Sequence, residues 1–156
     1  MTNTLEASID IDATPAEVWT VISDLKRMGE WSPQCRMMRV LGGEVRGGTK
    51  TFNLNKKGLL VWPTSSKVIR FEPNQAIAWR VVENHTIWTY EITAGDKTST
   101  LTERREAPTG TTKISSFLVD KFMGGTAGFE EDMVKGMNTT LTRIKSEVES
   151  KARARG

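Results

Sequence analysis

Two residues that could take part in acid–base chemistry fall on neighbouring segments with an alternating pattern. Glu103 lies in the run Thr100-Leu-Thr-Glu-Arg, and Tyr90 lies in Trp88-Thr-Tyr. A carboxyl group and a phenol can exchange a proton with a substrate that is held within hydrogen-bond reach. Glu103 and Tyr90 are therefore the candidate catalytic residues, although the sequence shows no dedicated acid–base pair.

The orientation of Glu103 leaves two interpretations open. Side chains two positions apart on a strand share a face, so Glu103 and Arg105 point inward if Leu101 does. A buried carboxylate would need a cationic partner, for which Arg70, Arg80 and Arg105 are available, or would bind a proton. The alternative is a solvated strand face with cross-strand ion pairs, which the rarity of fully buried charges favours.

Other chemistry has little support in the residue types. The single histidine, His85, falls in the turn Glu83-Asn-His, and we expect it at the surface. The single cysteine, Cys35, has no sequence partner for a nucleophile pair, and no Cys or His cluster has the spacing of metal ligands. The paired glycines at 42–43 and 47–48 lack the strand-then-helix context of a phosphate loop and indicate turns. We expect no metal and no cofactor.

A larger set of residues suits a binding pocket. Aromatic and aliphatic residues recur in the same phase along 76–82 and 86–93, and an inward Val68 would bring the residues at 62, 64 and 66 to the same face. A wall of aromatic and thioether side chains with a few hydroxyls is typical of a small-molecule pocket, although each residue taken singly is also typical of a core. The candidate ligand-binding residues are Trp31, Trp62, Thr64, Ser66, Trp79, Trp88, Tyr90, Phe122, Met133 and Met137.

These side chains need a sheet to position them. The alternation of Leu5, Ala7, Ile9 and Ile11 with polar residues predicts a first strand with one wet face. Further strands are predicted at residues 36–41, 49–54, 59–71, 76–82, 86–93 and 98–105. The separators between them are short and turn-like, so neighbouring strands should run antiparallel.

Helices are predicted at both ends of this series of strands. Thr14, Pro15 and Glu17 form a capping box with proline at the first helical position, and a second short helical turn runs from Asp24 to Gly29. An apolar stripe predicts a helix over about residues 126–150, roughly 36 Å long; its members are Phe129, Met133, Met137, Leu141, Ile144 and Val148. A further apolar helical segment at 114–122 precedes a break at Gly124-Gly125. One helix covers only part of a curled sheet, so a cavity should remain.

Size and charge limit the alternatives. A chain of 156 residues suits one domain, over residues 1–150, followed by a frayed basic tail at 151–156. The net charge of +3 is too small and too terminal to indicate nucleic-acid binding, and no apolar run is long enough to span a bilayer. With one cysteine and no signal peptide, we expect a cytoplasmic protein, either a monomer or a homodimer.

An ordered set of short segments resembles a known family. The segments are Ala13-Thr-Pro-Ala-Glu-Val-Trp, Asp24-Leu, Glu30-Trp-Ser-Pro, Trp79-Arg-Val, Trp88-Thr-Tyr, Thr100-Leu-Thr-Glu-Arg and Gly136-Met-Asn-Thr-Thr-Leu-Thr-Arg-Ile-Lys. Together they resemble the bacterial polyketide cyclase/dehydrase and lipid transport group of the Bet v 1-like (START, SRPBCC) superfamily. The resemblance implies an α+β helix-grip fold, in which a curved antiparallel sheet of about seven strands wraps around a long C-terminal helix.

Three functions are compatible with these patterns. The leading hypothesis is binding or carriage of a lipid-like or polyketide-like molecule in an internal cavity, without catalysis; the break at Gly124-Gly125 would let the helix ends part for access. The second is a polyketide cyclase or aromatase that uses Tyr90 and Glu103, as the family resemblance allows. The third is an accessory or chaperone-like protein whose apolar face contacts another protein.

Overall fold

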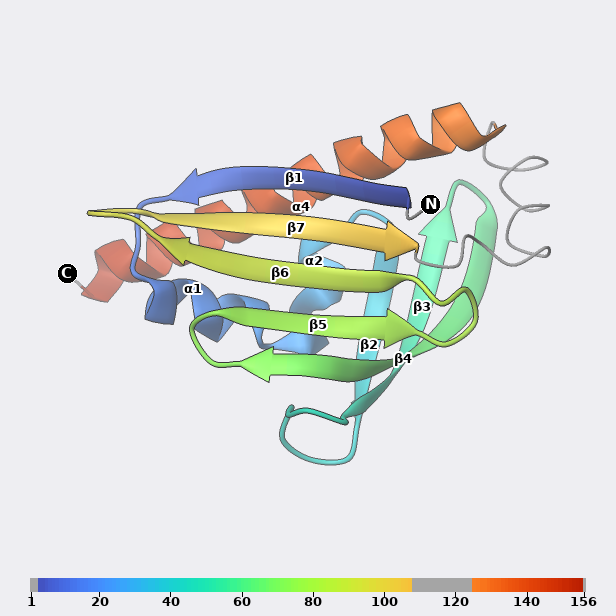
Figure 1. The fold of residues 1–156 in the computed structure, drawn as a ribbon, viewed down its shortest axis with the longest axis horizontal. Coiled ribbons are helices and arrows are strands. Elements are labelled where there is room, and N and C mark those ends of the chain that lie inside the picture. Colours follow the sequence, from blue (N-terminus) through green and yellow to red (C-terminus); the bar gives the residue numbers. More distant parts are fainter. Residues whose placement is uncertain (1–2, 108–124, 156) are drawn as a thin grey trace.

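A seven-stranded antiparallel sheet curves around helices that lie on its concave side (Figure 1). The computed structural model describes residues 3–107 and 125–155, with side chains from 4 to 107 and from 130 to 154. The strands are β1 (Asn3–Ile11), β2 (Cys35–Leu41), β3 (Lys50–Lys57), β4 (Leu60–Glu72), β5 (Ala76–Val81), β6 (Ile87–Ala94) and β7 (Ser99–Ala107). The helices are α1 (Pro15–Ile22), the short 3-10 helix η1 (Leu25–Arg27), α2 (Met28–Trp31) and α4 (Gly125–Arg155). The predicted helix-grip fold is confirmed.

The strand order follows from the short connections. The order in space is β1-β7-β6-β5-β4-β3-β2, so β2 to β7 form a meander and β1 pairs with the last strand. The β4–β5 turn passes through Asn74 and the β5–β6 turn through His85, each with a positive φ. His85 is exposed, as expected, and contacts the exposed Arg80.

The predicted start of α1 is present in full. The Thr14 side chain accepts a hydrogen bond from the Glu17 backbone, and the Glu17 carboxylate accepts one from the Thr14 backbone. This reciprocal cap satisfies two backbone N–H groups that a helix N-terminus otherwise leaves without partners. The helix begins close to the end of β1, which places α1 against the sheet.

Two β-bulges change which side chains point inward. Cys35 pairs with Asn55 and Met37 with Leu54, so Arg36 is an extra residue on β2. A second register shift lies between Val68 and Arg70 on β4. An extra residue bends the strand and redirects the side chains around it. Strict alternation, on which the sequence analysis relied, therefore fails at both places.

The half of the concave side next to α1 is solid. Leu141, Ile144 and Val148 of α4 are each at most 1% exposed and belong to the hydrophobic core. Their companions in this core include side chains from β1, α1, β6 and β7: Ile11, Val18, Val21, Ile22, Ile92 and Leu101. This packing of α4 against the sheet and α1 fixes the helix in place.

The helix α4 is longer than the sequence predicted. It continues to Arg155, beyond the end near residue 150 that the apolar stripe predicted, and includes residues 151–155 of the expected basic tail. Ala152 and Ala154 favour helix, and Lys151 pairs with Glu147 one turn earlier, at 3.2 Å. Basic side chains near a helix C-terminus also interact favourably with its dipole. The apolar segment predicted at 114–122 and Gly124 lie outside the described residues.

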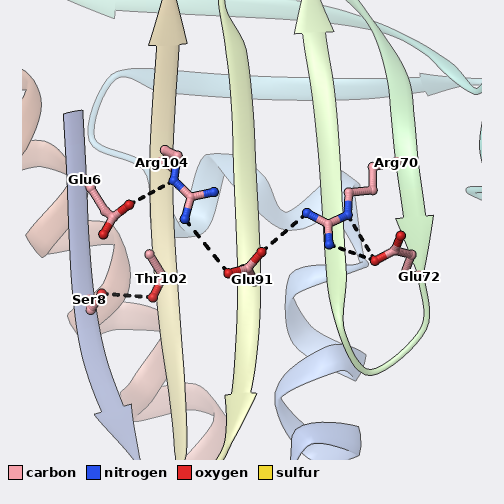
Figure 2. A network of polar contacts seen from close by, with 7 residues as sticks. All are labelled: Glu6, Ser8, Arg70, Glu72, Glu91, Thr102 and Arg104. Atoms are coloured by element: carbon pink, nitrogen blue, oxygen red, sulfur yellow. Dashed lines mark hydrogen bonds and ion pairs between the residues drawn. The ribbon is translucent and has the colours of Figure 1, made fainter. Parts of the chain in front are cut away.

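The convex face of the sheet carries a chain of ion pairs (Figure 2). Arg104 on β7 contacts Glu6 at 2.8 Å and Glu91 at 3.9 Å, and Arg70 on β4 contacts Glu72 at 2.9 Å and Glu91 at 3.4 Å. β5 lies between β4 and β6, and the residues it places next to Arg70 and Glu72 are the small Ala78 and Ala76. The Arg70 side chain can therefore reach across β5 to Glu91. These five charged side chains are thus paired with one another.

Candidate functional site

The other half of the concave side is hollow. Beneath the N-terminal half of α4 lies a cavity of about 500 Å³, a volume in the range of small-molecule sites. Its lining comes from the segment 32–36, the end of β3, the strands β6 and β7, and α4. These lining residues include Ser32, Gln34, Trp88, Glu103, Met133, Gly136, Met137 and Thr140.

A smaller chamber of about 80 Å³ adjoins this cavity at Ser32, Gln34, Trp88 and Glu103. Its apolar side is formed by Met28, Met38 and Val81 with the rings of Trp79 and Tyr90, which stack with centroids 5.6 Å apart. Rigid aromatic side chains give a large contact area for an apolar guest.

The opposite side of the small chamber is polar. The Asn55 amide donates to the Thr64 hydroxyl at 3.0 Å, and the Asn53 amide donates to the same hydroxyl at 3.2 Å. Behind them, Ser66 is hydrogen-bonded to Thr51, whose hydroxyl also contacts the side-chain oxygen Oδ1 of Asn53 at 2.8 Å. These polar groups are held by one another, so the wall keeps its shape and offers hydroxyl and amide atoms to a ligand.

Glu103 lies between the two cavities and is only 3% exposed. It pairs across the strands with Tyr90 on β6 and with Ala7 on β1. Among the buried side-chain polar atoms of the described residues, its Oε1 atom is the one without a hydrogen-bond partner. A buried acceptor without a partner carries a desolvation cost of about 1–3 kcal/mol, which a ligand could remove.

Burial raises the pKa of Glu103 from 4.5 to about 8, and a hydrogen bond with the Tyr90 side chain partly opposes this shift. Burial together with the nearby Glu103 raises the pKa of Tyr90 well above 10. The Tyr90 hydroxyl also lies 3.9 Å from the Met28 sulfur. At neutral pH both groups are protonated, so this part of the cavity offers hydrogen-bond donors and no charge.

The expected arginine partners of Glu103 are engaged elsewhere. Arg70 contacts Glu72 and Glu91 on the convex face, and Arg80 contacts His85 in a turn. Arg105 is buried at 4% exposure, which lowers its pKa, while attraction to Glu130 of α4 raises it. The interpretation of Glu103 as part of a solvated strand face was wrong, because the concave face at β7 is closed off by helix and cavity walls.

A comparison of the sequence with protein-family models finds one match. The model described as "Polyketide cyclase / dehydrase and lipid transport" covers residues 2–149. The chain belongs to this family. The resemblance seen in the short sequence segments is thereby confirmed over nearly the whole chain. A search of curated proteins returned no match.

Solved structures of this fold are similar over almost the entire chain. A Polyketide_cyc-like protein from Corynebacterium glutamicum is 29% identical, with a TM-score of 0.62, covering 97% of this chain and 94% of that one. The Zhui aromatase/cyclase from Streptomyces sp. R1128 is 18% identical, with a TM-score of 0.78, covering 100% and 99%. Ara h 8.0201 is 13% identical, with a TM-score of 0.68, covering 96% and 99%. The last two similarities show the fold alone.

Within this family fold, the structure brings six of the ten expected ligand-binding residues to the cavity walls. Met133, Met137 and Trp88 line the large cavity. Thr64, Trp79, Tyr90 and again Trp88 line the small chamber. Phe122 lies outside the described residues. The catalytic candidates Tyr90 and Glu103 are directly paired across β6 and β7.

Three expected wall residues line neither of these cavities. Trp31 is 5% exposed and packs in the core, with the Arg27 guanidinium 4.6 Å above its ring. Ser66 is buried behind Thr64, where its hydroxyl bonds with Thr51. Trp62 lies near the β3–β4 hairpin, where its carbonyl accepts a bond from Asn55. Alternation placed Ser66 on the correct face but does not show where along a strand a cavity ends.

Sequence reasoning missed the polar half of the site. Asn53 and Asn55 point inward from β3, while Phe52, the residue before Asn53, is 41% exposed. A period of two along a strand identifies its two faces but does not show which face points inward. On β3, hydrophobicity alone would have placed the face of Phe52 inward, which is the wrong face. Gln34 and Ser32 were missed because they lie in a loop, where no periodicity operates. The signal that could have found Asn53 and Asn55 is their spacing of two, although Asn55 lies just beyond the predicted strand at 49–54 and inside the observed β3.

Two further features of the described residues concern metal ligands and membrane-spanning helices. No group of three or more His, Cys, Asp or Glu side chains there could hold a metal ion. None of the helices in that part of the chain is long and apolar enough to cross a membrane.

Proposed function

We propose that this protein binds a small molecule with a mainly hydrophobic body, lipid-like or polyketide-like, in the cavity beneath α4, and performs no reaction on it. The observation that supports this most strongly is the hollow itself. Trp79, Trp88 and Tyr90 border empty space in a structure whose other half is solid. A packed interior leaves few voids larger than a water molecule, so a lined hollow of this volume is suited to a ligand.

The polar atoms of the cavity add a preference for an oxygen-bearing ligand. The protonated Glu103 and the Thr64 hydroxyl, which accepts from Asn53 and Asn55, can donate hydrogen bonds to a carbonyl, hydroxyl or ether oxygen. A purely hydrocarbon guest would leave the Oε1 atom of Glu103 without a partner. We therefore favour a molecule with an apolar or aromatic body and at least one oxygen function at the inner end. The unpaired Cys35 is consistent with a reducing compartment such as the cytoplasm.

The direct test is native mass spectrometry after mild purification, together with thermal shifts against lipids and aromatic polyketides. We expect a copurifying mass or a rise in melting temperature, because a ligand that binds only the native state stabilises it by mass action. If no compound of a broad library raises the melting temperature and no ligand mass copurifies, the proposal is overturned.

A matched pair of variants at Gly136 separates loss of the cavity from loss of the fold. Gly136 lies on α4 in the cavity wall, and a Cβ atom there would stand 3.5 Å from the Pro33 ring without a clash. Gly136→Leu should fill part of the cavity and abolish the thermal shift, whereas Gly136→Ala should retain it. Both variants should fold, because each replaces a helical glycine with a better helix former. A thermal shift that survives in Gly136→Leu would place the ligand elsewhere.

One observation favours a second candidate, a cyclase or aromatase of the kind the family description names. Glu103, with a pKa raised to about 8, lies beside Tyr90 at the cavity wall, and such a group can exchange protons near neutral pH. Glu103→Gln and Tyr90→Phe should then lower the rate of cyclisation of a poly-keto chain by about 100-fold or more. In a passive container, spontaneous cyclisation in the presence of the protein would be the same with either variant.

A further inference from the structure

The outer end of the large cavity carries an excess of positive charge. Four basic side chains line it, namely Arg36, Lys56, Lys57 and Lys135. One exposed carboxylate, Asp132, lies among them and is paired with Lys57 at 2.6 Å. The other acidic residue of the lining is the buried Glu103, which is protonated at neutral pH. Three cationic side chains therefore remain in excess over the ionised carboxylate of this lining.

Arg36 is held at the cavity rim by the backbone around it. It is the extra residue of the bulge on β2, and bulges of this kind redirect a side chain. Gly29 of α2 packs so closely on this strand that a Cβ there would lie 2.3 Å from the Arg36 carbonyl oxygen. The preceding Gln34 carbonyl accepts a bond from the Lys56 backbone at 2.8 Å, and the Ser32 hydroxyl accepts one from the Cys35 backbone at 3.0 Å.

The same contacts bring the basic residues together from three elements. The bond between Lys56 and Gln34 joins the end of β3 to the segment that carries Arg36. The ion pair between Lys57 and Asp132 joins the end of β3 to α4, three residues before Lys135. Arg36, Lys56 and Lys135 are all exposed, and within the described residues no carboxylate forms a salt bridge with any of them. Three like charges at one rim repel one another unless an anion lies between them.

We propose that this rim binds the anionic end of an amphipathic organic acid, with Arg36, Lys56 and Lys135 around the acid group and the apolar body inside the cavity. The inference rests on the proposed function and adds the chemical class and orientation of the ligand. The acid group stays at the solvent-exposed rim, where its desolvation cost is small. The body extends past Trp88 and the thioethers of Met133 and Met137 toward the neutral donors around Glu103. A ligand in the reverse orientation would bury its charge beside Glu103, which is only 3% exposed.

Two fluorescent probes with the same ring system test the proposal. 1-Anilinonaphthalene-8-sulfonate carries one sulfonate, and N-phenyl-1-naphthylamine is the corresponding neutral amine. The triple variant Arg36→Ala, Lys56→Ala, Lys135→Ala should weaken binding of the sulfonate roughly tenfold and leave the neutral probe within about twofold. Raising the salt concentration from about 20 mM to about 500 mM should weaken only the sulfonate in the wild type.

A second triple variant removes the same number of positive charges away from the cavity, so it controls for the change in net charge. Lys26→Ala, Arg39→Ala, Lys67→Ala removes three exposed basic side chains that line neither cavity, and it should leave the affinity for both probes unchanged. Equal loss of both probes in the rim variant, or no loss of the sulfonate, would overturn the anion site while the proposed function stands. Failure of the wild-type protein to bind either probe would instead count against the proposed function itself.

Discussion

The two halves of the concave side differ in what fills them, although one helix covers both. The C-terminal half of α4 presents Leu141, Ile144 and Val148 to a close-packed core with α1. The N-terminal half presents Met133 and Met137 to a cavity bordered by aromatic and polar side chains. The first half stabilises the fold and the second leaves space for a ligand. The same apolar stripe thus serves two purposes along its length.

Alanine substitutions along the stripe of α4 should show this difference most strongly. Leu141→Ala opens a void in the solid half and should cost about 3–5 kcal/mol of unfolding free energy. Met133→Ala enlarges an existing cavity and should cost roughly 1 kcal/mol, because its side chain has fewer packed neighbours to lose. Chemical denaturation of both variants measures the two values. Equal costs would mean that the two halves are packed alike.

Glu103 in the hollow half should make the free energy of unfolding depend on pH. Because the pKa of Glu103 is raised to about 8 in the folded state, the folded protein keeps a proton that the unfolded chain has lost. The contribution of Glu103 to stability should therefore be fully present below its unfolded pKa of about 4.5, fall as the pH rises, and be lost near pH 8. Tyr90 and Cys35, the titratable groups facing Glu103 from β6 and β2, have raised pKa values and stay neutral in this range.

Between about pH 5.5 and about pH 7.5 the loss should be about 2–3 kcal/mol, and Glu103→Gln should remove most of it. Denaturation curves at several pH values measure this slope. Asp96→Asn, in the exposed β6–β7 turn, is the control and should keep the wild-type slope. A slope that Glu103→Gln leaves unchanged would show that Glu103 does not carry the proton.

Two tryptophan variants should show where the cavity ends along the sheet. Trp88→Ala removes a ring from both cavity walls and should weaken binding of N-phenyl-1-naphthylamine about tenfold. Trp62→Ala removes a ring of the same size that lines neither cavity, and the affinity should stay within about twofold of the wild type. Fluorescence titration measures both. A larger loss of probe affinity in Trp62→Ala would mean that the Trp62 ring does line the cavity, as the alternation of the strand predicted.

The smallest effect is expected on the convex face. Arg70→Ala breaks the contacts with Glu72 and Glu91, but these side chains are more than a third exposed and solvent screens their interaction. The loss of unfolding free energy should be below about 1 kcal/mol, and probe binding should be unchanged. A change in probe affinity would mean that the outer ion pairs (Figure 2) are coupled to the cavity.

Local patterns predicted the elements of this fold well. The capping box at Thr14 and the stripe that includes Leu141 each depend on neighbours within a few residues, and both are present. The pairing of adjacent strands followed from the short turns between them. The helix end at Arg155 was missed because i,i+4 pairs and helix propensity extend the helix beyond the apolar stripe.

The site was predicted only in part, because its geometry depends on features without a local signal. The bulge at Arg36 is visible only from the pairing of β2 with β3. The inward direction of Asn53 depends on hydrogen bonds with residues of β4. The burial of Glu103 depends on β6, β7 and the helices together, so neither interpretation of this residue could be chosen beforehand.

The most direct test of the central claim, that a ligand occupies the hollow half, is an NMR titration of the indole N–H signals with N-phenyl-1-naphthylamine. The chain has five tryptophans, and single Trp→Phe variants assign their signals. We expect the signals of Trp79 and Trp88 to shift on binding, while that of Trp19, which packs against Phe71 in the solid half, stays in place. Shifts at Trp19 without shifts at Trp79 and Trp88, or no shifts at all, would contradict it.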